Sequence, residues 1–388
     1  STLWGNTRDP LVRLAAEESH QAAVAAVMAH VESLSATRVM TDGVQRRVAA
    51  DGLVAAVFDE YTSREGDPHM HTHVVISSKV WAAPIQPEPS IEQAAAGVVP
   101  EVVGSWRALD ARELKFYQRT LSAMYHRAFE AEMASRAGVA YIRDPKTQWV
   151  AGRIKDFPRQ AGEILSKRSK QIASRLKEHL VEFETQYGRK ATPLERYQIE
   201  RRTAETTRGP KQAENAGTHT DLHAAWNAEL EHAGIDLDLI DAVAGQIRGP
   251  IELTVEEQAA VIEQAMIETQ RSYSVFNRNH VATEIARALP PGAGGTAAGT
   301  VGLILDMADI GIETLGIPVT EANTITSDVN PHYTTRHIID SEQAIISNIQ
   351  TLTATEGAPN PAAINQADEG IVLTGQQAET ATRIAGTE

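Results

Sequence analysis

Three histidines stand at alternate positions in one short stretch of the chain, and this spacing constrains the fold more than any other feature. They are His69, His71 and His73, within the segment PHMHTHVVIS, residues 68–77. The β-branched residues that follow them favour a pleated strand, in which every second side chain points to one face. The three imidazoles are therefore expected to line one face of a β-strand.

Distance decides how many of these histidines can share a metal ion. Residues two apart on a strand are separated by roughly 7 Å, and their imidazoles can reach one ion. Residues four apart are separated by roughly 13 Å, too far for two ligand bonds of about 2 Å. At most two of the three can bind one ion, so a third ligand should come from a neighbouring strand. The run GLVAAVFDEY, residues 52–61, has strand character and carries Asp59 and Glu60 near its end. The alternative reading is a coincidental row of solvent-facing histidines.

Two blocks of sequence carry a family resemblance. SATRVMTDG, residues 35–43, and GLVAAVFDEYTSREGDPHMHTHVVIS, residues 52–77, resemble the nuclease domain of MobF-type conjugative relaxases, the TrwC/TraI relaxase-helicase family of HUH endonucleases. The resemblance implies an α/β (α+β) fold, with a central antiparallel sheet of the HUH relaxase type and flanking helices. A mainly helical C-terminal region is expected to follow.

The resemblance also assigns candidate metal ligands. His71 and His73 fall on the family's metal-binding pair, and Glu60 stands where the family has its third histidine. Two histidines and one carboxylate favour harder ions such as Mg or Mn over softer ones, and we also consider Zn. The other reading of Glu60 is a lineage that has lost tight metal binding.

The nucleophile of the resembling family is a tyrosine near the start of the protein. The opening residues STLWG look like the end of the strand that follows it, and none of the eight tyrosines of this chain matches the context of that nucleophile. We therefore expect a relaxase fragment with no identifiable catalytic residue, inactive by itself, and leave open whether it is an enzyme.

The charge distribution indicates where DNA would bind. The net charge is −15, yet residues 151–211 hold 15 lysines and arginines against 8 aspartates and glutamates. Lys167, Arg168 and Lys170 lie in a basic helical tract there, and Arg64 lies between the two metal strands. These four are the candidate DNA contacts, because Lys and Arg neutralise backbone phosphates in any sequence. The alternatives are a solvated helix with salt pairs, and a local ion pair for Arg64.

Pattern also predicts the organisation of the chain. We expect a helix over residues 10–33, capped by Asp9, and a helix over residues 110–136. The second helix carries an apolar stripe that we expect in the core, made of Phe116, Tyr117, Leu121, Tyr125 and Phe129. Residues 83–104 look like an inserted loop, and the Gly-rich segment 290–302 looks like a linker or loop, since it lacks the lysine of an ATP-binding loop.

We predict two domains. Residues 1–250 would form the relaxase (HUH nuclease) domain, truncated at its N-terminus. Residues 251–388 would form a linker and the first part of a helicase-like domain that ends before its ATP-binding loop.

Three functions remain open at this point. The first is a metal-dependent relaxase fragment, of the class that nicks single-stranded DNA at a plasmid origin of transfer by tyrosine transesterification. The second is a non-catalytic remnant that binds single-stranded DNA, and the third is an unrelated iron oxygenase. The resemblance implies partners as well: origin DNA, a conjugative coupling protein and a type IV secretion system. The chain has no cysteine and no apolar run long enough for a membrane span, so we expect a cytoplasmic protein without membrane insertion.

Overall fold

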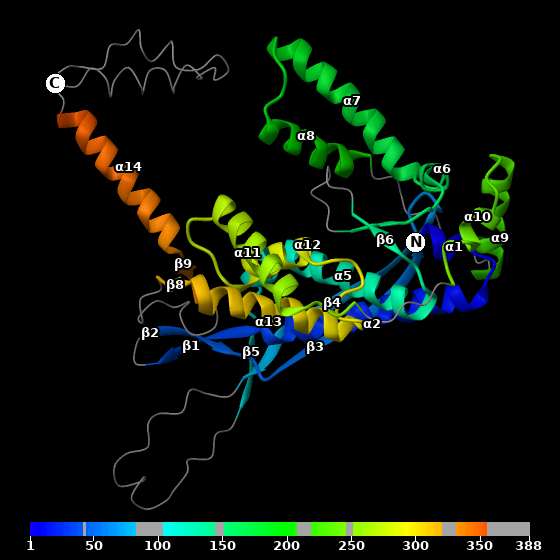
Figure 1. Ribbon diagram of the computed structural model, residues 1–388. Coiled ribbons are helices and arrows are strands. Elements are labelled where there is room, and N and C mark those ends of the chain that lie inside the picture. Colours follow the sequence, from blue (N-terminus) through cyan, green and yellow to red (C-terminus); the bar gives the residue numbers. More distant parts are fainter. Residues whose placement is uncertain are drawn as a thin grey trace, which may run out of the picture. The chain divides into compact units, whose positions relative to one another are not determined.

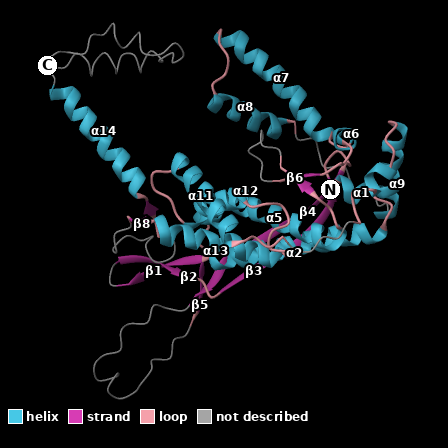
Figure 2. Ribbon diagram, in the orientation of Figure 1, coloured by secondary structure: helices cyan, strands magenta, loops and turns pink. Residues whose placement is uncertain are grey.

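The protein combines helices with short antiparallel sheets, as the sequence predicted (Figures 1 and 2). The computed structural model describes residues 1–41, 44–82, 104–143, 151–207, 219–245, 251–319 and 331–354. The chain divides into two compact units, residues 1–334 and residues 335–388. The sheets and all but one of the described helices belong to the first unit.

The central sheet has three antiparallel strands in the order β3-β4-β5: β3 is Gly52–Thr62, β4 is Pro68–Ala82 and β5 is Ser105–Ala108. The predicted hairpin of two metal strands is therefore confirmed. A second antiparallel ribbon joins β1, Ala36–Thr41, to β2, Val44–Ala49. Two smaller ribbons pair β6 (Tyr141–Ile142) with β7 (Arg153–Ile154), and β8 (Ile317–Pro318) with β9 (Tyr333–Thr334). Most of the predicted loop over residues 83–104 lies outside the described residues.

The opening segment is a helix, so the prediction that it ends a strand was wrong. Helix α1 spans Thr2–Asn6, and the backbone N–H groups of Gly5 and Thr7 donate to the carbonyls of Ser1 and Leu3. These hydrogen bonds satisfy the backbone locally, so the segment needs no partner strand.

Helix α2 confirms its prediction, since it spans Pro10–Ser33 and the Asp9 carboxylate accepts from the N–H of Leu11. The single helix predicted over residues 110–136 is two helices, α4 (Arg112–Phe116) and α5 (Gln118–Ala137). The break falls at Tyr117, which is buried and whose hydroxyl accepts a hydrogen bond from Asn277 Nδ2.

The break also changes the predicted apolar stripe. Phe116 is 79% exposed, so its assignment to the core was wrong. It lies in α4, before the break, whereas the other four stripe residues, Tyr117, Leu121, Tyr125 and Phe129, are buried or half-buried. A stripe at helical spacing stays on one face only while the helix is continuous.

The remaining helices follow in chain order: α6 (Arg159–Ile164), α7 (Lys167–Tyr187), α8 (Pro193–Thr206), α9 (His219–His232), α10 (Asp238–Asp241), α11 (Val255–Ser272), α12 (Arg278–Ala288), α13 (Ala297–Leu315) and α14 (Arg336–Ala354). Helix α14 lies in the second unit. The helical character predicted for the C-terminal region is confirmed in the described residues.

Helices from both predicted domains share one core. Helix α2 packs on α5, and both contact α13, while α12 also packs on α5. Both helices carry buried alanines, among them Ala16 and Ala23 of α2 and Ala128 of α5. The compact unit thus continues past residue 250 to residue 334. A helicase-like identity for residues 251–388 stays a prediction.

The Gly-rich segment is only partly a loop, so its assignment as a linker or loop was wrong from Ala297 onward, where α13 begins. Gly294 has φ +88°, and a Cβ there would lie 2.6 Å from Thr300 Cα, so the turn requires glycine. The Glu132 carboxylate of α5 accepts from the N–H of Ala297 at 2.7 Å. This carboxylate takes the place that an anion would occupy at the helix N-terminus.

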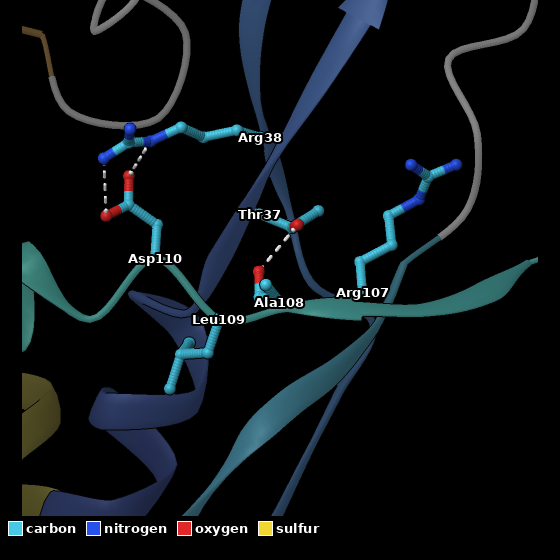
Figure 3. Close-up of a pocket in the computed structure, with 6 residues that line it drawn as sticks. All are labelled: Thr37, Arg38, Arg107, Ala108, Leu109 and Asp110. Atoms are coloured by element: carbon cyan, nitrogen blue, oxygen red, sulfur yellow. Dashed lines mark hydrogen bonds and ion pairs between the residues drawn. The ribbon is translucent and has the colours of Figure 1, made fainter.

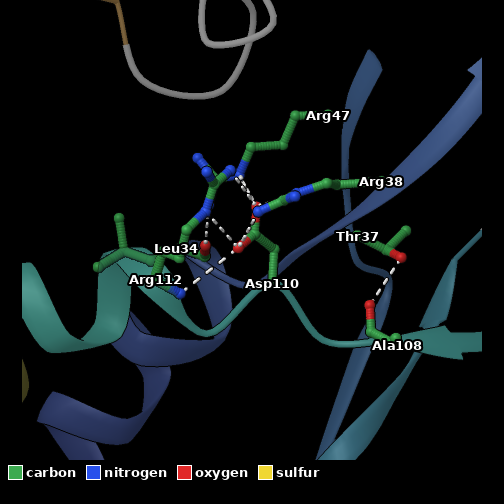
Figure 4. Close-up of polar contacts among 7 residues, drawn as sticks. All are labelled: Leu34, Thr37, Arg38, Arg47, Ala108, Asp110 and Arg112. Atoms are coloured by element: carbon green, nitrogen blue, oxygen red, sulfur yellow. Dashed lines mark hydrogen bonds and ion pairs between the residues drawn. The ribbon is translucent and has the colours of Figure 1, made fainter. Parts of the chain in front are cut away.

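A buried ion-pair cluster joins the β1–β2 ribbon to the chain after β5. Arg38 and Arg47 are directly opposite one another on β1 and β2, an unfavourable placement for two like charges. Asp110 lies close to both: Arg38 donates to its carboxylate (Figure 3), and Arg47 Nε lies 3.7 Å away. Arg112 donates to the same carboxylate (Figure 4). The side chains of Arg47 and Asp110 are only 2% and 4% exposed.

We expect Asp110→Asn to lower the free energy of unfolding by about 3 kcal/mol, because it removes a buried negative charge that lies 3.7 Å from the buried guanidinium of Arg47. Chemical denaturation at neutral pH measures this. Asp238→Asn is the matched control, because Asp238 also pairs with an arginine, Arg8, but is 77% exposed, so the change should be small. Equal effects of the two variants would contradict the expectation that the buried Asp110 contributes more to stability than the exposed Asp238.

The cluster also predicts a pH dependence. Burial by itself raises the pKa of Asp110, but hydrogen bonds from Arg112 and Arg38 outweigh it and hold the pKa well below the ordinary value of 3.8. The carboxylate therefore contributes its full stability above that value and loses it as the pH falls toward the folded-state pKa. The stability difference between the wild type and Asp110→Asn should be constant above about pH 5 and shrink in more acidic buffer. A difference that grows on acidification would contradict this sign.

Candidate metal centre and nucleic-acid interface

The register of β3 against β4 brings the three predicted ligands together. Glu60 lies directly opposite His71, and Phe58 directly opposite His73. One oxygen of Glu60 lies 3.5 Å from His71 Nε2 and 3.7 Å from His73 Nε2. The ligand atoms of all three residues lie within 4.8 Å of one another.

These distances fit a shared ion. Ligand atoms that each lie 2.0–2.2 Å from a tetrahedral ion are roughly 3.3–3.6 Å apart. Both distances from Glu60 are close to that range. Carboxylate oxygen and imidazole nitrogen are ligands that Zn and first-row divalent ions accept. The residues therefore fit a metal site, and binding itself is taken up as a proposal below.

A hydrogen bond fixes the form of His71 that a metal requires. His71 Nδ1 lies 2.8 Å from the carbonyl oxygen of His69. A carbonyl only accepts, so Nδ1 carries the proton, and in the neutral ring the Nε2 lone pair faces Glu60. A second partner of this kind commonly orients a metal-binding imidazole.

His69 contributes through its backbone and not as a third ligand. Its ring lies 4.4 Å from the His71 ring, between centroids, and the His71 and His73 rings are 5.1 Å apart. Within the described residues, the group of possible ligands is Glu60, His71 and His73, without His69. This agrees with the expectation that only two of the three histidines can share an ion.

The turn between the two strands is fastened to two helices. Asp67 is buried, and its carboxylate accepts from the backbone N–H of Lys167 at the start of α7. Trp226 of α9 donates to the carbonyl of Gly66 at 2.7 Å. These contacts hold the ends of β3 and β4 in place next to the metal cluster. Arg64 lies exposed on this turn.

Two of the predicted DNA contacts make structural contacts inside the protein. The Lys167 ammonium pairs with Glu229 at 2.7 Å and with Asp67 at 3.3 Å. Arg168 donates to the carbonyls of Ala204 and Thr207, which joins α7 to α8. Lys170 is exposed. A DNA-binding role stays a prediction for all three and for Arg64.

A series of hydrogen-bonded polar side chains lies on the face of the hairpin opposite the metal cluster, and the sequence analysis did not predict it. The ring nitrogens of His20 on α2 lie 2.6 Å from the hydroxyls of Tyr125 and Thr72. Thr72 in turn donates to Asp59 at 2.5 Å. Asp59 and Thr72 are opposite one another and point to the other face of the hairpin from Glu60 and His71. Burial lowers the pKa of His20 and raises that of Tyr125.

None of the tyrosines whose pKa is perturbed has the lowered pKa of an activated nucleophile. Burial raises the pKa of Tyr61, Tyr125 and Tyr141, which keeps each hydroxyl protonated. An adjacent base can also activate a nucleophile, and among these three tyrosines Tyr125 has a histidine, His20, at 2.6 Å from its hydroxyl. Tyr61 follows Glu60 in β3, but its ring stacks on Trp4 at 5.4 Å, as expected for the opposite face of the strand.

Comparison with known proteins identifies the family. A family model described as TrwC relaxase matches residues 1–233. This match covers more than half of the chain, and the chain belongs to the TrwC relaxase family. The sequence resemblance is thereby confirmed.

Two curated relatives are similar to parts of the chain. The multifunctional conjugation protein TraI of Escherichia coli is 46% identical over 61 residues, which cover 16% of this chain and 4% of TraI. The TraI of E. coli strain K12 is 26% identical over 162 residues, or 40% of this chain and 9% of TraI. The matched residues thus span less than a tenth of these relatives.

Solved structures of TrwC show similarity as well. A complex of the conjugative relaxase TrwC with mutant oriT DNA is 23% identical and has a TM-score of 0.41, over 58% of this chain and 69% of that chain. A copper-bound complex of TrwC with oriT DNA is 25% identical and also has a TM-score of 0.41, over 58% and 66% of the two chains. The family assignment rests on the family model.

Among the helices of the described residues, none combines the length and the apolar character needed to cross a membrane.

We expect His71→Ala to abolish stoichiometric binding of divalent metal, measured by calorimetry with Mn, Mg and Zn. The variant removes a ligand whose Nε2 faces Glu60. His69→Ala is the matched control, because it removes an imidazole from the same strand but keeps the carbonyl that orients His71. Equal loss of binding in both variants would show that the cluster is not the binding site.

The variant Glu60→His separates an intact site from a degenerate one. It restores the three-histidine set of the resembling family at the position opposite His71. If the wild type binds metal, Glu60 serves as a ligand. Binding by the Glu60→His variant alone would mean that the site with its natural glutamate no longer binds metal.

Proposed function

We propose that this chain is part of a conjugative relaxase and that it binds a divalent metal ion and single-stranded DNA at a plasmid origin of transfer. The observation that carries the proposal is the convergence of Glu60, His71 and His73 inside the relaxase family domain. When bound, such an ion polarises a scissile phosphate and offsets negative charge on its non-bridging oxygens. Glu60, His71 and His73 would hold the ion, and Mg, Mn and Zn are the candidates.

The nicking reaction of the resembling family uses a tyrosine. We propose that none of the eight tyrosines of this sequence performs that step. The raised pKa values of Tyr61, Tyr125 and Tyr141 support this, as does the engagement of the Tyr117 hydroxyl with Asn277. The contribution of the described residues is then to bind metal and to position DNA.

An exposed aromatic ring supports a role in binding single-stranded DNA. Phe58 is 57% exposed and lies directly opposite His73, so it shares the face of the metal cluster. Base stacking on an exposed aromatic side chain is the usual contact of single-stranded nucleic acids with proteins. Phe58 would thus hold a base next to the ion that holds a phosphate. Arg64 and Lys170 would add contacts to the backbone.

One observation supports a second function. Glu60 replaces the family's third histidine, which favours a remnant that binds single-stranded DNA without metal. Membership of the relaxase family argues against the iron oxygenase. A coupling protein and a type IV secretion system remain proposed partners, and a cytoplasmic location remains a prediction.

We expect Phe58→Ala to weaken binding of a single-stranded oligodeoxynucleotide with the origin sequence by about 1–3 kcal/mol, the usual cost of one lost stacking contact. Fluorescence anisotropy with and without Mn measures it. Val57→Ala is the matched control, because Val57 is 55% exposed but points to the opposite face of β3.

The outcomes separate the two functions. Binding that depends on Phe58 and strengthens with Mn supports the metal-dependent relaxase. Binding that depends on Phe58 but ignores Mn supports the non-catalytic remnant. Equal affinities of the wild type, Phe58→Ala and Val57→Ala would refute this face as the DNA-binding surface.

A further inference from the structure

Two residues on the face of the hairpin opposite the metal cluster are sequence neighbours of the proposed ligands. Thr72 lies between His71 and His73 on β4, and Asp59 precedes Glu60 on β3. Thr72 and Asp59 are directly opposite one another across the two strands. Neighbouring residues of a strand share one backbone and point to opposite faces. A contact that fixes Thr72 and Asp59 therefore also restrains the backbone that carries the ligands.

The hydrogen bonds on this face have one consistent direction. The Asp59 carboxylate only accepts, so the Thr72 hydroxyl gives its one proton to it at 2.5 Å. The Thr72 oxygen then has only lone pairs left, and His20 Nε2, which lies 2.6 Å away, donates to it. In the neutral ring His20 Nδ1 is an acceptor and takes the proton of the Tyr125 hydroxyl at 2.6 Å. Tyr125, His20, Thr72 and Asp59 thus form one polar chain.

Burial supports this arrangement of protons. His20 is 4% exposed, and burial lowers its pKa, which favours the neutral ring with one donor and one acceptor nitrogen. Burial also raises the pKa of Tyr125, so the hydroxyl keeps its proton. A buried imidazole with a partner at each nitrogen is held in one orientation. His20 on α2 therefore connects α5, through Tyr125, to the middle of β4, through Thr72.

We propose that His20 is a positioning residue for the metal cluster and acts through Thr72 on the placement of His71 and His73. The proposal rests on the proposed function, because metal binding by the cluster is itself proposed. Residues that hold metal ligands in place from outside the coordination shell change metal affinity by roughly 10–100-fold when they are mutated. Without His20, the strand between the two histidine ligands loses its side-chain contact with α2.

The test compares His20→Ala with His30→Ala, a matched control. His30 lies on the same helix and is 3% exposed, but its ring contacts Asn279 of α12 and not the hairpin. Thermal unfolding first establishes that both variants fold. Calorimetry should then show that His20→Ala binds Mn about tenfold more weakly than the wild type, the lower end of the usual range. His30→Ala should bind Mn like the wild type, because a loss of stability alone does not displace the ligands.

Two further variants test the route through Thr72. Thr72→Val keeps the shape of the side chain and removes the hydroxyl. The double variant His20→Ala with Thr72→Val should lose no more Mn affinity than either single variant, because both changes remove the same connection. His20→Gln should keep most of the affinity, since its amide N–H can donate to Thr72 in place of Nε2. Additive losses, or a loss in His20→Gln equal to that in His20→Ala, would overturn this route.

Amide hydrogen exchange tests the same connection in the metal-free protein. Peptides that cover residues 57–62 and 69–75 should exchange faster in His20→Ala than in His30→Ala, because only the first variant removes a contact of the hairpin. The proposal is overturned if the two variants agree both in Mn affinity and in exchange of these peptides. If the wild type binds no metal, the proposed function fails, and exchange alone then decides whether His20 holds the hairpin.

Discussion

The pairing of β3 with β4 is the interaction on which the candidate site depends. Because side chains alternate between the two faces of a strand, a slip of one residue would move Glu60 to the opposite face from its present one. In the observed register Glu60 lies opposite His71 and Phe58 opposite His73. One set of backbone hydrogen bonds therefore places two imidazoles, a carboxylate and an exposed aromatic ring on the same surface, while Asp59 and Thr72 face His20 on the other side.

The rest of the unit holds this hairpin from several sides. The turn between the strands is fixed by Lys167 of α7 and Trp226 of α9, through Asp67 and Gly66. The polar chain through His20 ties the reverse face of the hairpin to α2 and α5. Such support keeps a small cluster of ligands in fixed geometry without relying on the hairpin alone, which by itself is marginally stable.

Arginine has two different roles at the two sites of positive charge. On α7, Arg168 joins the helix to the carbonyls of α8, and the basic tract expected to contact DNA is partly engaged within the protein. After β5, three arginines, Arg38, Arg47 and Arg112, surround the buried carboxylate of Asp110. The second group was not apparent in the sequence, because its members come from β1, β2 and the start of α4 and are up to 74 residues apart, from Arg38 to Arg112.

The sequence by itself determined the local features. The alternation of His69, His71 and His73 predicted the strand, and the distance between residues along a strand limited the ion to two of them. Asp9 predicted the start of α2. Each depends on residues close together in the chain. Only the tertiary structure decided the features that join distant residues: the break at Tyr117 under Asn277, the Glu132 carboxylate at the start of α13, and the arginines around Asp110. The physical reason is that these contacts depend on how whole helices and strands pack, and local spacing carries no record of that packing.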